Sequence, residues 1–361
     1  MRLFQNSAYV PAYQPRFRHL SRKCSSFAEY LQTFLQDRYG VCHLLSPVLD
    51  GDPSAFFTNG TDELVQRCWA AENGLNREVA LADILLAQIE AHRTEVFYNL
   101  DPVSYGSDFI RRLPGCVKKS YAWRAAPSPR SDFSAYHAMV CNFPGILESY
   151  RQLGWKAAYF APAHDPAMDA YAANTERPVD VLFVGGFSRH HRRRVELLES
   201  VAALAGRYRV AMHLDSSRLT RWAESPLGRW LPLAEHRRPK AIQAVSQPPV
   251  FGLDLYRTLS RAKVVINGAI DMAGEDRGNM RCFEAMGTAC VLLSDAGHYP
   301  AGMENGKTLL TYLSAADAVD QLHALLAAPD RLTALARAGH ELVATQYSKA
   351  AQWAAFQALA Q

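Results

Sequence analysis

Residues 271–295 have the sequence DMAGEDRGNMRCFEAMGTACVLLSD. A loop that holds Gly274 and Gly278 leads into a short helical pattern at 281–286 and then into an apolar run at 289–294. In open α/β sheets, ligands bind beyond the carboxyl ends of the strands. A glycine-containing loop that opens a helix also directs unpaired backbone N–H groups toward a phosphate. This stretch therefore predicts a nucleotide-diphosphate site at the edge of a parallel sheet.

Glu284 lies within the helical pattern of this stretch. A carboxylate at this place is suited to accept hydrogen bonds from a ribose diol, as the acidic residue of dinucleotide sites does. Taken alone, the pattern is equally consistent with a solvated glutamate and with glycines that only turn the chain, because short motifs recur by chance. The remainder of the chain decides between these interpretations.

Short apolar runs alternate with amphipathic stretches over most of the sequence, which is typical of parallel strands joined by crossover helices. We therefore expect the α/β class. The expected strands are 96–99, 120–123, 138–141 and 158–161, a weaker one at 41–45, and then 181–184, 208–213, 263–267 and 289–294. The expected helices of the second half are 194–205, 253–261, 281–286, 315–327, 331–345 and 349–359.

Residues 161–178 interrupt this alternation, because they contain three prolines and no sustained periodicity. We expect them to connect two domains, at 1–165 and 178–345, and a last amphipathic helix to occupy 346–361. A length of 361 residues with 49% hydrophobic and 20% charged residues is ample for two such cores.

The net charge is only +4, from 39 Lys and Arg against 35 Asp and Glu, so no dedicated nucleic-acid binder is expected. Seven scattered cysteines form no C-x-x-C pair, which predicts neither a disulfide framework nor a zinc site. The chain opens without an apolar leader, and no apolar run reaches a membrane-spanning length. We expect a cytoplasmic protein without an integral membrane segment; peripheral membrane association and the oligomeric state stay open.

Several segments of the second half resemble a known family. FEAM at 283–286, followed by a small-residue turn and the apolar run 291–294, resembles the FEAMA-x-G-x-P-V-V segment of glycosyltransferase family 4 and of spore-maturation-type glycosyltransferases, which belong to the group 1 glycosyl transferases. The sequences DVLFVGG at 180–186 and HRRRVELL at 191–198 resemble the opening of their C-terminal domain. LYRTLSRAKVVIN at 255–267 and TQYS at 345–348 agree with the same pattern.

This resemblance implies the GT-B architecture, in which two Rossmann-like domains face each other across a cleft and the C-terminal helix crosses back to the N-terminal domain. Trp353 and Phe356 are then expected to pack on the N-terminal domain. The implied reaction transfers a hexosyl group from a UDP-, GDP- or dTDP-sugar to a glycan, lipid, peptide or small-molecule acceptor. The donor is expected in 178–345 and the acceptor in 1–165, with no tightly bound cofactor and no metal.

Charge on the departing pyrophosphate must be stabilised, and arginines or helix N-termini do this. Arg189 and Arg193 are favoured within the basic run that follows 181–184, because successive arginines fan around a helix and only some face one side. The other expected donor contacts are strand-end glycines, motif residues and an aromatic wall for the base: Gly185, Gly186, Arg277, Gly278, Asn279, Arg281, Glu284 and Phe251.

The retaining members carry two glutamates separated by seven residues. Asp276 occupies the first position here and Glu284 the second, with Glu275 as an alternative for the first. This spacing favours retention, in which the departing phosphate itself accepts the proton from the acceptor. The family glycine that follows the motif is Ala289 here, and Gly287 is displaced, so we expect a remodelled turn.

An inverting reaction would need a general base on the acceptor side. Asp101 is the preferred candidate, because it follows the expected strand 96–99 at the carboxyl edge of its sheet. His137 and His164 are weaker candidates, since a lone histidine is more often structural. The competing functions are a nucleotide-sugar epimerase or hydrolase of the same fold and a non-catalytic nucleotide-binding subunit.

Overall fold

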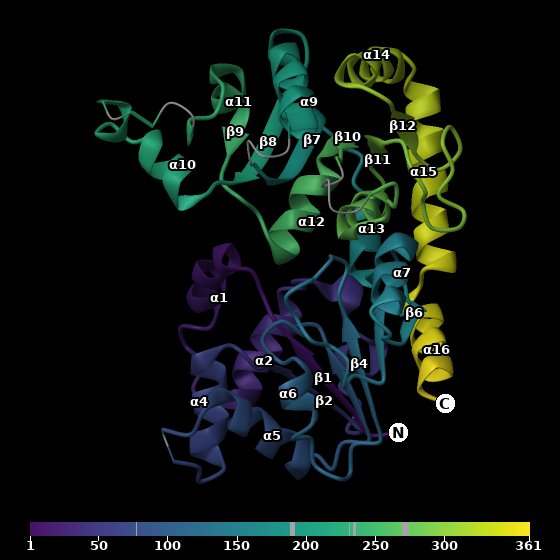
Figure 1. Ribbon diagram of the computed structural model, residues 1–361. Helices are drawn as coiled ribbons and strands as arrows, with labels where there is room; N and C mark the ends of the chain where they lie inside the picture. The colour runs from purple at the N-terminus through teal and green to yellow at the C-terminus, as the bar shows by residue number, and fades with distance from the viewer. Residues whose placement is uncertain (77, 188–191, 231, 234–235, 269–273) are drawn as a thin grey trace. The chain divides into compact units, whose positions relative to one another are not determined.

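Two parallel sheets of six strands each organise the chain, which confirms the expected α/β class (Figure 1). The structure is a computed structural model and describes residues 1–76, 78–187, 192–230, 232–233, 236–268 and 274–361. One compact unit consists of residues 1–163 together with 347–361, and the other consists of residues 164–346. None of the described helices is long and apolar enough to cross a bilayer.

The first unit has the strand order β2-β1-β3-β4-β5-β6. Its strands are β1 (Leu3–Ser7), β2 (Ala55–Asn59), β3 (Val96–Asn99), β4 (Lys119–Trp123), β5 (Ala138–Cys141) and β6 (Ala157–Tyr159). Its helices are α1 (Gln14–Leu20), α2 (Phe27–Gln36), α3 (Ser46–Leu49), α4 (Glu63–Glu72), α5 (Leu81–Ala91), α6 (Ser107–Ile110), α7 (Pro144–Gln152) and α16 (Lys349–Ala360). The expected strands from 96 onward are confirmed within two residues at each end.

Strand β1 was not predicted from the sequence, because its second half is polar. Gln5 is fully buried, and its side chain donates to the His43 carbonyl at 3.0 Å and accepts from the Leu45 amide at 3.1 Å. These bonds replace the apolar alternation by which a strand is recognised. The expectation of a strand at 41–45 was wrong, because Val41–His43 forms a short 3₁₀ helix whose backbone these bonds hold.

Helix α16 packs on the sheet of the first unit. The ring of Phe356 lies 5.0 Å from that of Tyr98 and 5.8 Å from that of Phe160, centroid to centroid. The buried Lys349 ammonium donates to the carbonyls of Val41 and Leu44 at 2.6 and 2.7 Å, so it caps the carbonyl end of the 3₁₀ helix. Burial, with Lys349 close by, lowers the pKa of His43 to about 3.

The second unit has the strand order β12-β11-β10-β7-β8-β9. Its strands are β7 (Val179–Gly186), β8 (Val210–Asp215), β9 (Ser246–Gln247), β10 (Ala262–Ile266), β11 (Val291–Asp295) and β12 (Leu310–Tyr312). Its helices are α8 (Asp169–Ala172), α9 (Arg192–Ala202), α10 (Arg218–Ala223), α11 (Lys240–Val245), α12 (Gly252–Ser260), α13 (Met280–Gly287), α14 (Ala315–Leu326) and α15 (Pro329–Gln346). The edge strands β9 and β12 were not expected, because two or three residues are too few to show a period.

Alternate residues of the second sheet face two helical layers. Val181 and Phe183 of β7 are buried in one core with apolar side chains of α9, α11 and α14. Helices α12, α13 and α15 pack together elsewhere in this unit, with α15 against β11. Because all six strands are parallel, their carboxyl ends meet at one edge, where loops and the starts of helices gather.

The segment 164–178, expected as a connection, is a folded part of the second unit. The Tyr256 hydroxyl donates to the Asp165 carboxylate at 3.1 Å, and the Arg177 guanidinium donates to the Thr288 carbonyl at 3.0 Å. A Cβ on Gly287 would lie 2.4 Å from the Met168 sulfur. The glycine displaced from its expected place thus lets this segment approach α13, while Ala289 takes the left-handed conformation at φ 53°.

Candidate functional site

An open pocket of about 920 Å³ lies at the carboxyl edge of the second sheet. Its walls come from the start of α9, the loops after β10 and β11, the loop before α13, and the segment from the end of β12 into α14. The lining residues are Arg192, Arg193, Arg194, Glu196, Leu197, Gly268, Gly274, Glu275, Arg277, Asp295, Ala296, Gly297, Tyr312, Leu313, Ser314 and Ala315. The sequence placed a ligand site at this edge.

Three consecutive arginines at the start of α9 divide into two roles. The Arg194 guanidinium donates to the carbonyls of Gly186 and Gly268 at 3.4 and 2.5 Å, so it ties the end of β7 to the end of β10. Arg192 and Arg193 are exposed and line the pocket. Among the described residues, neither has an acidic partner. Cations at a helix N-terminus face an unfavourable dipole, so an anion bound there relieves this repulsion.

Arg277 is the cation of the motif loop that lines the pocket. Its Nε lies 2.5 Å from an Asp295 carboxylate oxygen, and its Nη1 donates to the Gly274 carbonyl at 2.8 Å. The backbone amide of Arg277 donates to the His298 carbonyl at 2.8 Å. A Cβ on Gly297 would lie only 2.9 Å from the Arg277 Cγ. Contacts on several sides therefore fix this guanidinium.

A buried polar network lies beside this loop, and the sequence analysis missed its centre, Asn267. The Asn267 side-chain amide donates to the Ser294 hydroxyl at 3.1 Å, and its carbonyl oxygen accepts from the Asn279 amide at 3.3 Å. The Tyr312 hydroxyl donates to the backbone carbonyl of Asn267 at 2.8 Å. The available signal was a polar residue directly after an apolar strand. Asn279, expected as a donor contact, is thus part of the network that joins α13 to β10.

Glu284 and Arg281 form an ion pair one helical turn apart, with 2.6 Å between Nη1 and Oε2. Glu284 is only 5% exposed. Burial raises the pKa of this carboxyl, and the Arg281 charge opposes that effect. Arg281 was expected at a phosphate, and the structure gives it Glu284 as a partner. Neither residue is among those that line the pocket, and their roles toward a donor stay predictions.

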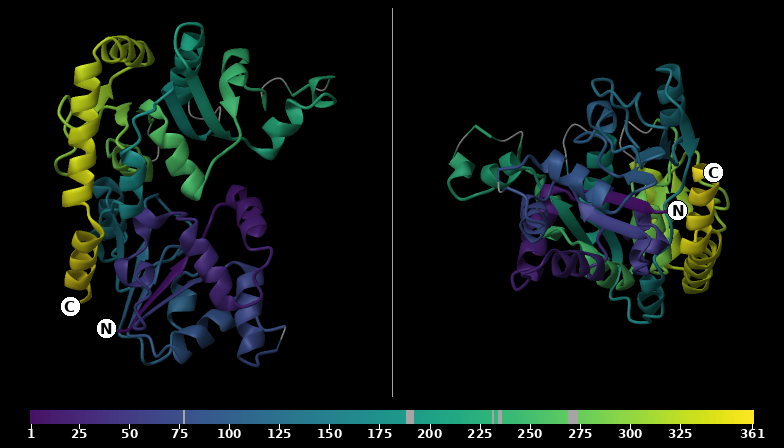
Figure 2. Two further views of the ribbon diagram at one scale, coloured as in Figure 1. Left: turned by 180° about the vertical axis from the view of Figure 1, so that it is seen from behind. Right: turned by 90° about the horizontal axis from the view of Figure 1, so that it is seen from below.

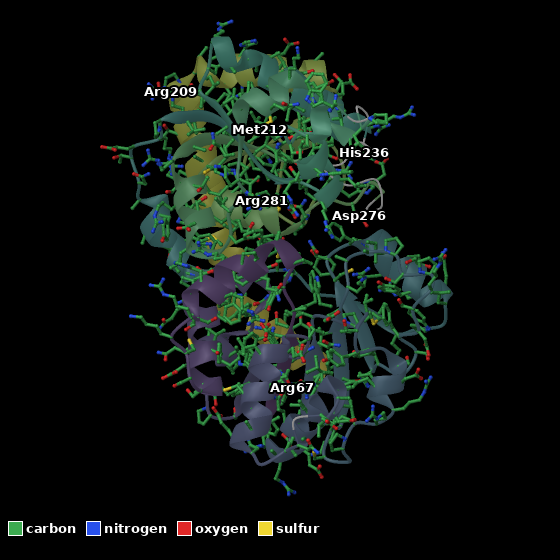
Figure 3. All side chains as sticks on the ribbon, turned by 90° about the vertical axis from the view of Figure 1, so that its left-hand side faces the viewer. Arg67, Arg209, Met212, His236, Asp276 and Arg281 are labelled. Carbon is green, nitrogen blue, oxygen red and sulfur yellow. The ribbon has the colours of Figure 1, made fainter. Side chains whose placement is uncertain are left out.

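Asp276 is 6% exposed, and its carboxylate lies 4.0 Å from the His298 ring nitrogen Nδ1. Figure 3 labels Asp276, in the loop before α13, and Arg281, in the first turn of that helix. Asp276 is outside the pocket lining, and Glu275, the alternative, is within it. Gly278 has φ 106°, a conformation that favours glycine.

The other residues that were expected to contact the donor lie at different places in the second unit. Gly185 and Gly186 end β7, and a Cβ on Gly186 would meet nothing within 4 Å. Phe251 is the residue before α12 and is not part of the pocket lining. Arg189 lies outside the described residues.

None of the three candidate bases belongs to this pocket. Asp101 follows β3 in the first unit, and its carboxylate accepts from the Ser104 amide at 3.2 Å, which holds a turn. His137 packs edge-on against Tyr121, and burial together with nearby lysines lowers its pKa. His164 lies in the second unit, where its Nε2 is 2.7 Å from the Asp169 carboxylate. Among the described residues, no cluster of His, Cys, Asp and Glu is arranged to hold a metal ion.

Most of the second unit and part of α16 match a known family. Residues 192–358 match the model of a family described as glycosyl transferase-like. The whole fold is similar to a sucrose-phosphate synthase from Thermosynechococcus elongatus, at 12% identity and a TM-score of 0.53, over 99% of this chain and 98% of that one. None of the curated proteins compared with this chain matches it.

Two further solved structures show the same fold. A glycosyltransferase from Rickettsia africae has 11% identity and a TM-score of 0.56, over 99% of this chain and 97% of that one. The HepE protein from Anabaena, solved in complex with UDP-glucose, has 10% identity and a TM-score of 0.59, over 99% and 98% of the two chains. At these identities the likeness shows the fold, which is that of the GT-B glycosyltransferases.

Proposed function

We propose that this chain, whose fold is similar to that of GT-B glycosyltransferases and whose residues 192–358 match a glycosyl transferase-like family model, transfers a hexosyl group from a nucleotide-sugar donor bound in the pocket of the second unit. The observation that carries this proposal is the placement of Arg192, Arg193 and Arg277 around one opening at the carboxyl edge of the sheet. The acceptor class stays open among glycans, lipids, peptides and small molecules.

The three guanidinium groups suit the leaving group of such a reaction. A nucleoside diphosphate gains negative charge as the glycosidic bond breaks, and fixed cations stabilise that charge. Arg277 is fixed by Asp295 and by backbone carbonyls, so it keeps its place through the reaction. Arg192 and Arg193 have no acidic partner among the described residues, so an incoming diphosphate does not compete with a carboxylate. These side chains supply the charge without requiring a divalent cation.

The carboxylates of the motif complete the proposal. Glu284 lies outside the pocket lining, and its proposed role is to accept hydrogen bonds from ribose hydroxyls of a donor that extends beyond that lining, with Arg281 favouring the ionised carboxylate. The spacing of Asp276 and Glu284 supports a retaining reaction, in which the departing phosphate accepts the acceptor proton. Asp101 would serve as the base only in an inverting reaction. UDP is the first nucleotide to test, because the similar HepE protein was solved with UDP-glucose.

A thermal-shift panel tests this proposal, with UDP, GDP and dTDP and their glucose conjugates as probes. One nucleoside diphosphate is expected to raise the unfolding midpoint in a concentration-dependent way, since a ligand that binds only the folded state stabilises it. Its sugar conjugate should then be converted to the diphosphate only when an acceptor is present. Release of the diphosphate without any acceptor would indicate a hydrolase, and a changed sugar that is still attached to the nucleotide would indicate an epimerase. If no member of the panel raises the midpoint, the protein binds none of these nucleotides and the proposal is wrong.

A further inference from the structure

The described residues between β8 and β9, which are 216–230, 232–233 and 236–245, form a projection from the second unit. Figures 1 and 2 show α10 and the loops that follow it extending outward beyond the β9 edge of the sheet. Figure 3 labels Met212 on β8, from which this segment departs, and His236 within it. The donor pocket is lined by none of these residues. Binding of the donor in the pocket therefore does not account for the projection.

Polar contacts fix the shape of this projection. The Arg238 Nε donates to both Glu224 carboxylate oxygens, at 2.9 and 3.1 Å, and the two side chains are only 16% and 14% exposed. The Arg237 guanidinium donates to the carbonyls of Ala223 and Gly228 at 3.2 and 2.9 Å. A Cβ on Gly228 would lie 1.9 Å from the Trp222 carbonyl oxygen, so only glycine fits this turn.

Four large apolar side chains of the projection are exposed to solvent. Leu219 and Trp222 are 50% and 52% exposed on α10, and Leu227 and Trp230 are 80% and 90% exposed in the next turn. Solvent-exposed tryptophans cost free energy unless something covers them, and grouped apolar side chains mark interaction sites. Indole rings are enriched where a protein meets the headgroup level of a membrane, since they join an apolar ring to a polar N–H.

The charge of this segment complements such a surface. Residues 216–245 carry six Lys and Arg against two acidic residues, a net charge of +4 that equals the net charge of the whole chain. Arg218, Arg221 and Lys240 are exposed, while the acidic Glu224 is occupied by Arg238. Basic residues near an anionic leaflet are attracted to its negatively charged headgroups. Two copies of this chain meeting through the projection would oppose like charges, which disfavours self-association.

We propose that the projection, residues 216–245, docks the protein on an anionic lipid surface. Trp222, Leu227 and Trp230 enter the headgroup region, while Arg218 and Arg221 contact lipid phosphates. The internal Glu224–Arg238 pair keeps the turn rigid, so little ordering is required on contact. This surface carries out its role whether or not the donor pocket acts as proposed.

Sedimentation with lipid vesicles tests the proposal on the full chain. Wild-type protein is expected to bind vesicles of equal parts phosphatidylcholine and phosphatidylglycerol, and to bind vesicles of phosphatidylcholine alone at least about tenfold more weakly. W222S/W230S should lower binding to the anionic vesicles at least about tenfold, because the apolar anchors are lost. R218Q/R221Q should weaken the same binding and reduce its dependence on salt.

The matched control is Leu153→Ser, a change of an apolar side chain that is 56% exposed in the first unit and outside the projection. It should leave vesicle binding unchanged. All variants should keep the wild-type thermal midpoint and its response to nucleoside diphosphate, which separates this proposal from that of the donor pocket. Equal binding by W222S/W230S and wild type would overturn the proposal. Failure of the wild-type protein to bind anionic vesicles would also overturn it. This holds even if the protein instead dimerises through Trp222 and Trp230.

Discussion

Both sheets are parallel and gather loops at their carboxyl edges, but the arginines at these two edges have different partners. In the first unit, the Arg18 guanidinium lies 2.8 Å from the Asp62 carboxylate, whose side chain is fully buried and also accepts from the Tyr9 hydroxyl. In the second unit, Arg192 and Arg193 lie exposed at the pocket, without an acidic partner among the described residues. The first edge thus uses its arginine to stabilise the fold, whereas the second pairs Arg277 with Asp295 and leaves Arg192 and Arg193 for a ligand.

Neutral hydrogen bonds are common to both edges. In the first unit, the Asn6 amide donates to the Asn99 side chain at 2.8 Å, and the Tyr105 hydroxyl donates to the Gly60 carbonyl at 2.6 Å. Asn267 plays the corresponding part in the second unit. Buried polar networks therefore stabilise both edges, and the exposed Arg192 and Arg193, which have no acidic partner among the described residues, distinguish the ligand site from its structural counterpart.

We expect the largest effect from a substitution at the carboxyl edge of the first sheet, where Arg18 and Asp62 are paired. Asp62→Ala removes the partner of Arg18 and the cap of α4, whose Val65 amide donates to Asp62. Asp62 is fully buried and Arg18 is 31% exposed, so the loss of the helix cap and of the charged hydrogen bonds should lower the free energy of unfolding by about 2–4 kcal/mol. Urea unfolding measures it. Asp108→Ala, at an exposed ion pair, is the control and should change little; equal losses in both would refute the contrast.

A second substitution introduces a steric clash at the carboxyl edge of the second sheet, beside Arg277. Gly297→Ala places a Cβ 2.4 Å from the Glu275 carbonyl oxygen and 2.9 Å from Arg277 atoms. We expect a loss of about 1–3 kcal/mol of stability and a roughly tenfold weaker nucleoside diphosphate response, because Arg277 shifts. Denaturant unfolding and thermal shifts measure the two effects. Gly115→Ala, where a Cβ meets nothing, should do neither; unchanged ligand binding in Gly297→Ala would remove Arg277 from the site.

The pH dependence of stability reports on the buried carboxyl group of Glu284 in the second unit. The pKa of Glu284 is raised by burial above its ordinary value of 4.5. The folded state therefore holds this proton more tightly than the unfolded chain, and stability falls as pH rises from about 4.5 to the raised pKa. Glu284→Gln, which cannot titrate, should abolish this part of the pH dependence in unfolding measured from pH 4 upward. Parallel curves for variant and wild type would contradict the assignment.

The smallest expected effect concerns the turn after α13. Ala289 holds φ 53°, which costs a non-glycine residue roughly 1–2 kcal/mol. Ala289→Gly relieves this cost. Glycine also makes the unfolded chain more flexible, which favours unfolding by about 0.4–1 kcal/mol, so a net stabilisation of up to about 1 kcal/mol is expected. Thermal unfolding would reveal it, and a clear destabilisation would show that the Ala289 methyl packs favourably.

The strands that the sequence predicted are those with apolar, buried residues throughout. β3 and β5 were expected with their observed bounds, because all their residues are buried and mostly apolar. β1 was missed, because Gln5 and Asn6 satisfy their polar groups through partners far along the chain. Long-range hydrogen bonds leave no local pattern, so a single sequence cannot show them.

The candidate site shows the same limit. Arg193 and Arg277 were expected at a phosphate, and both line the pocket. Gly297 and Tyr312 were missed, since only the parallel pairing of β11 with β12 brings their segments together. The Arg281–Glu284 pair lies three residues apart on a helix, a spacing at which side chains meet. That signal was available in the sequence.

Calorimetric titration with UDP tests most directly the claim that unpaired cations mark the donor site. Arg192→Gln/Arg193→Gln should weaken binding by roughly 10–100-fold, as expected for lost charged contacts, while stability stays within about 0.5 kcal/mol. Arg209→Gln, an exposed arginine at the opposite end of the sheet and labelled in Figure 3, should bind UDP like the wild type. Unweakened binding by the double variant would contradict the account.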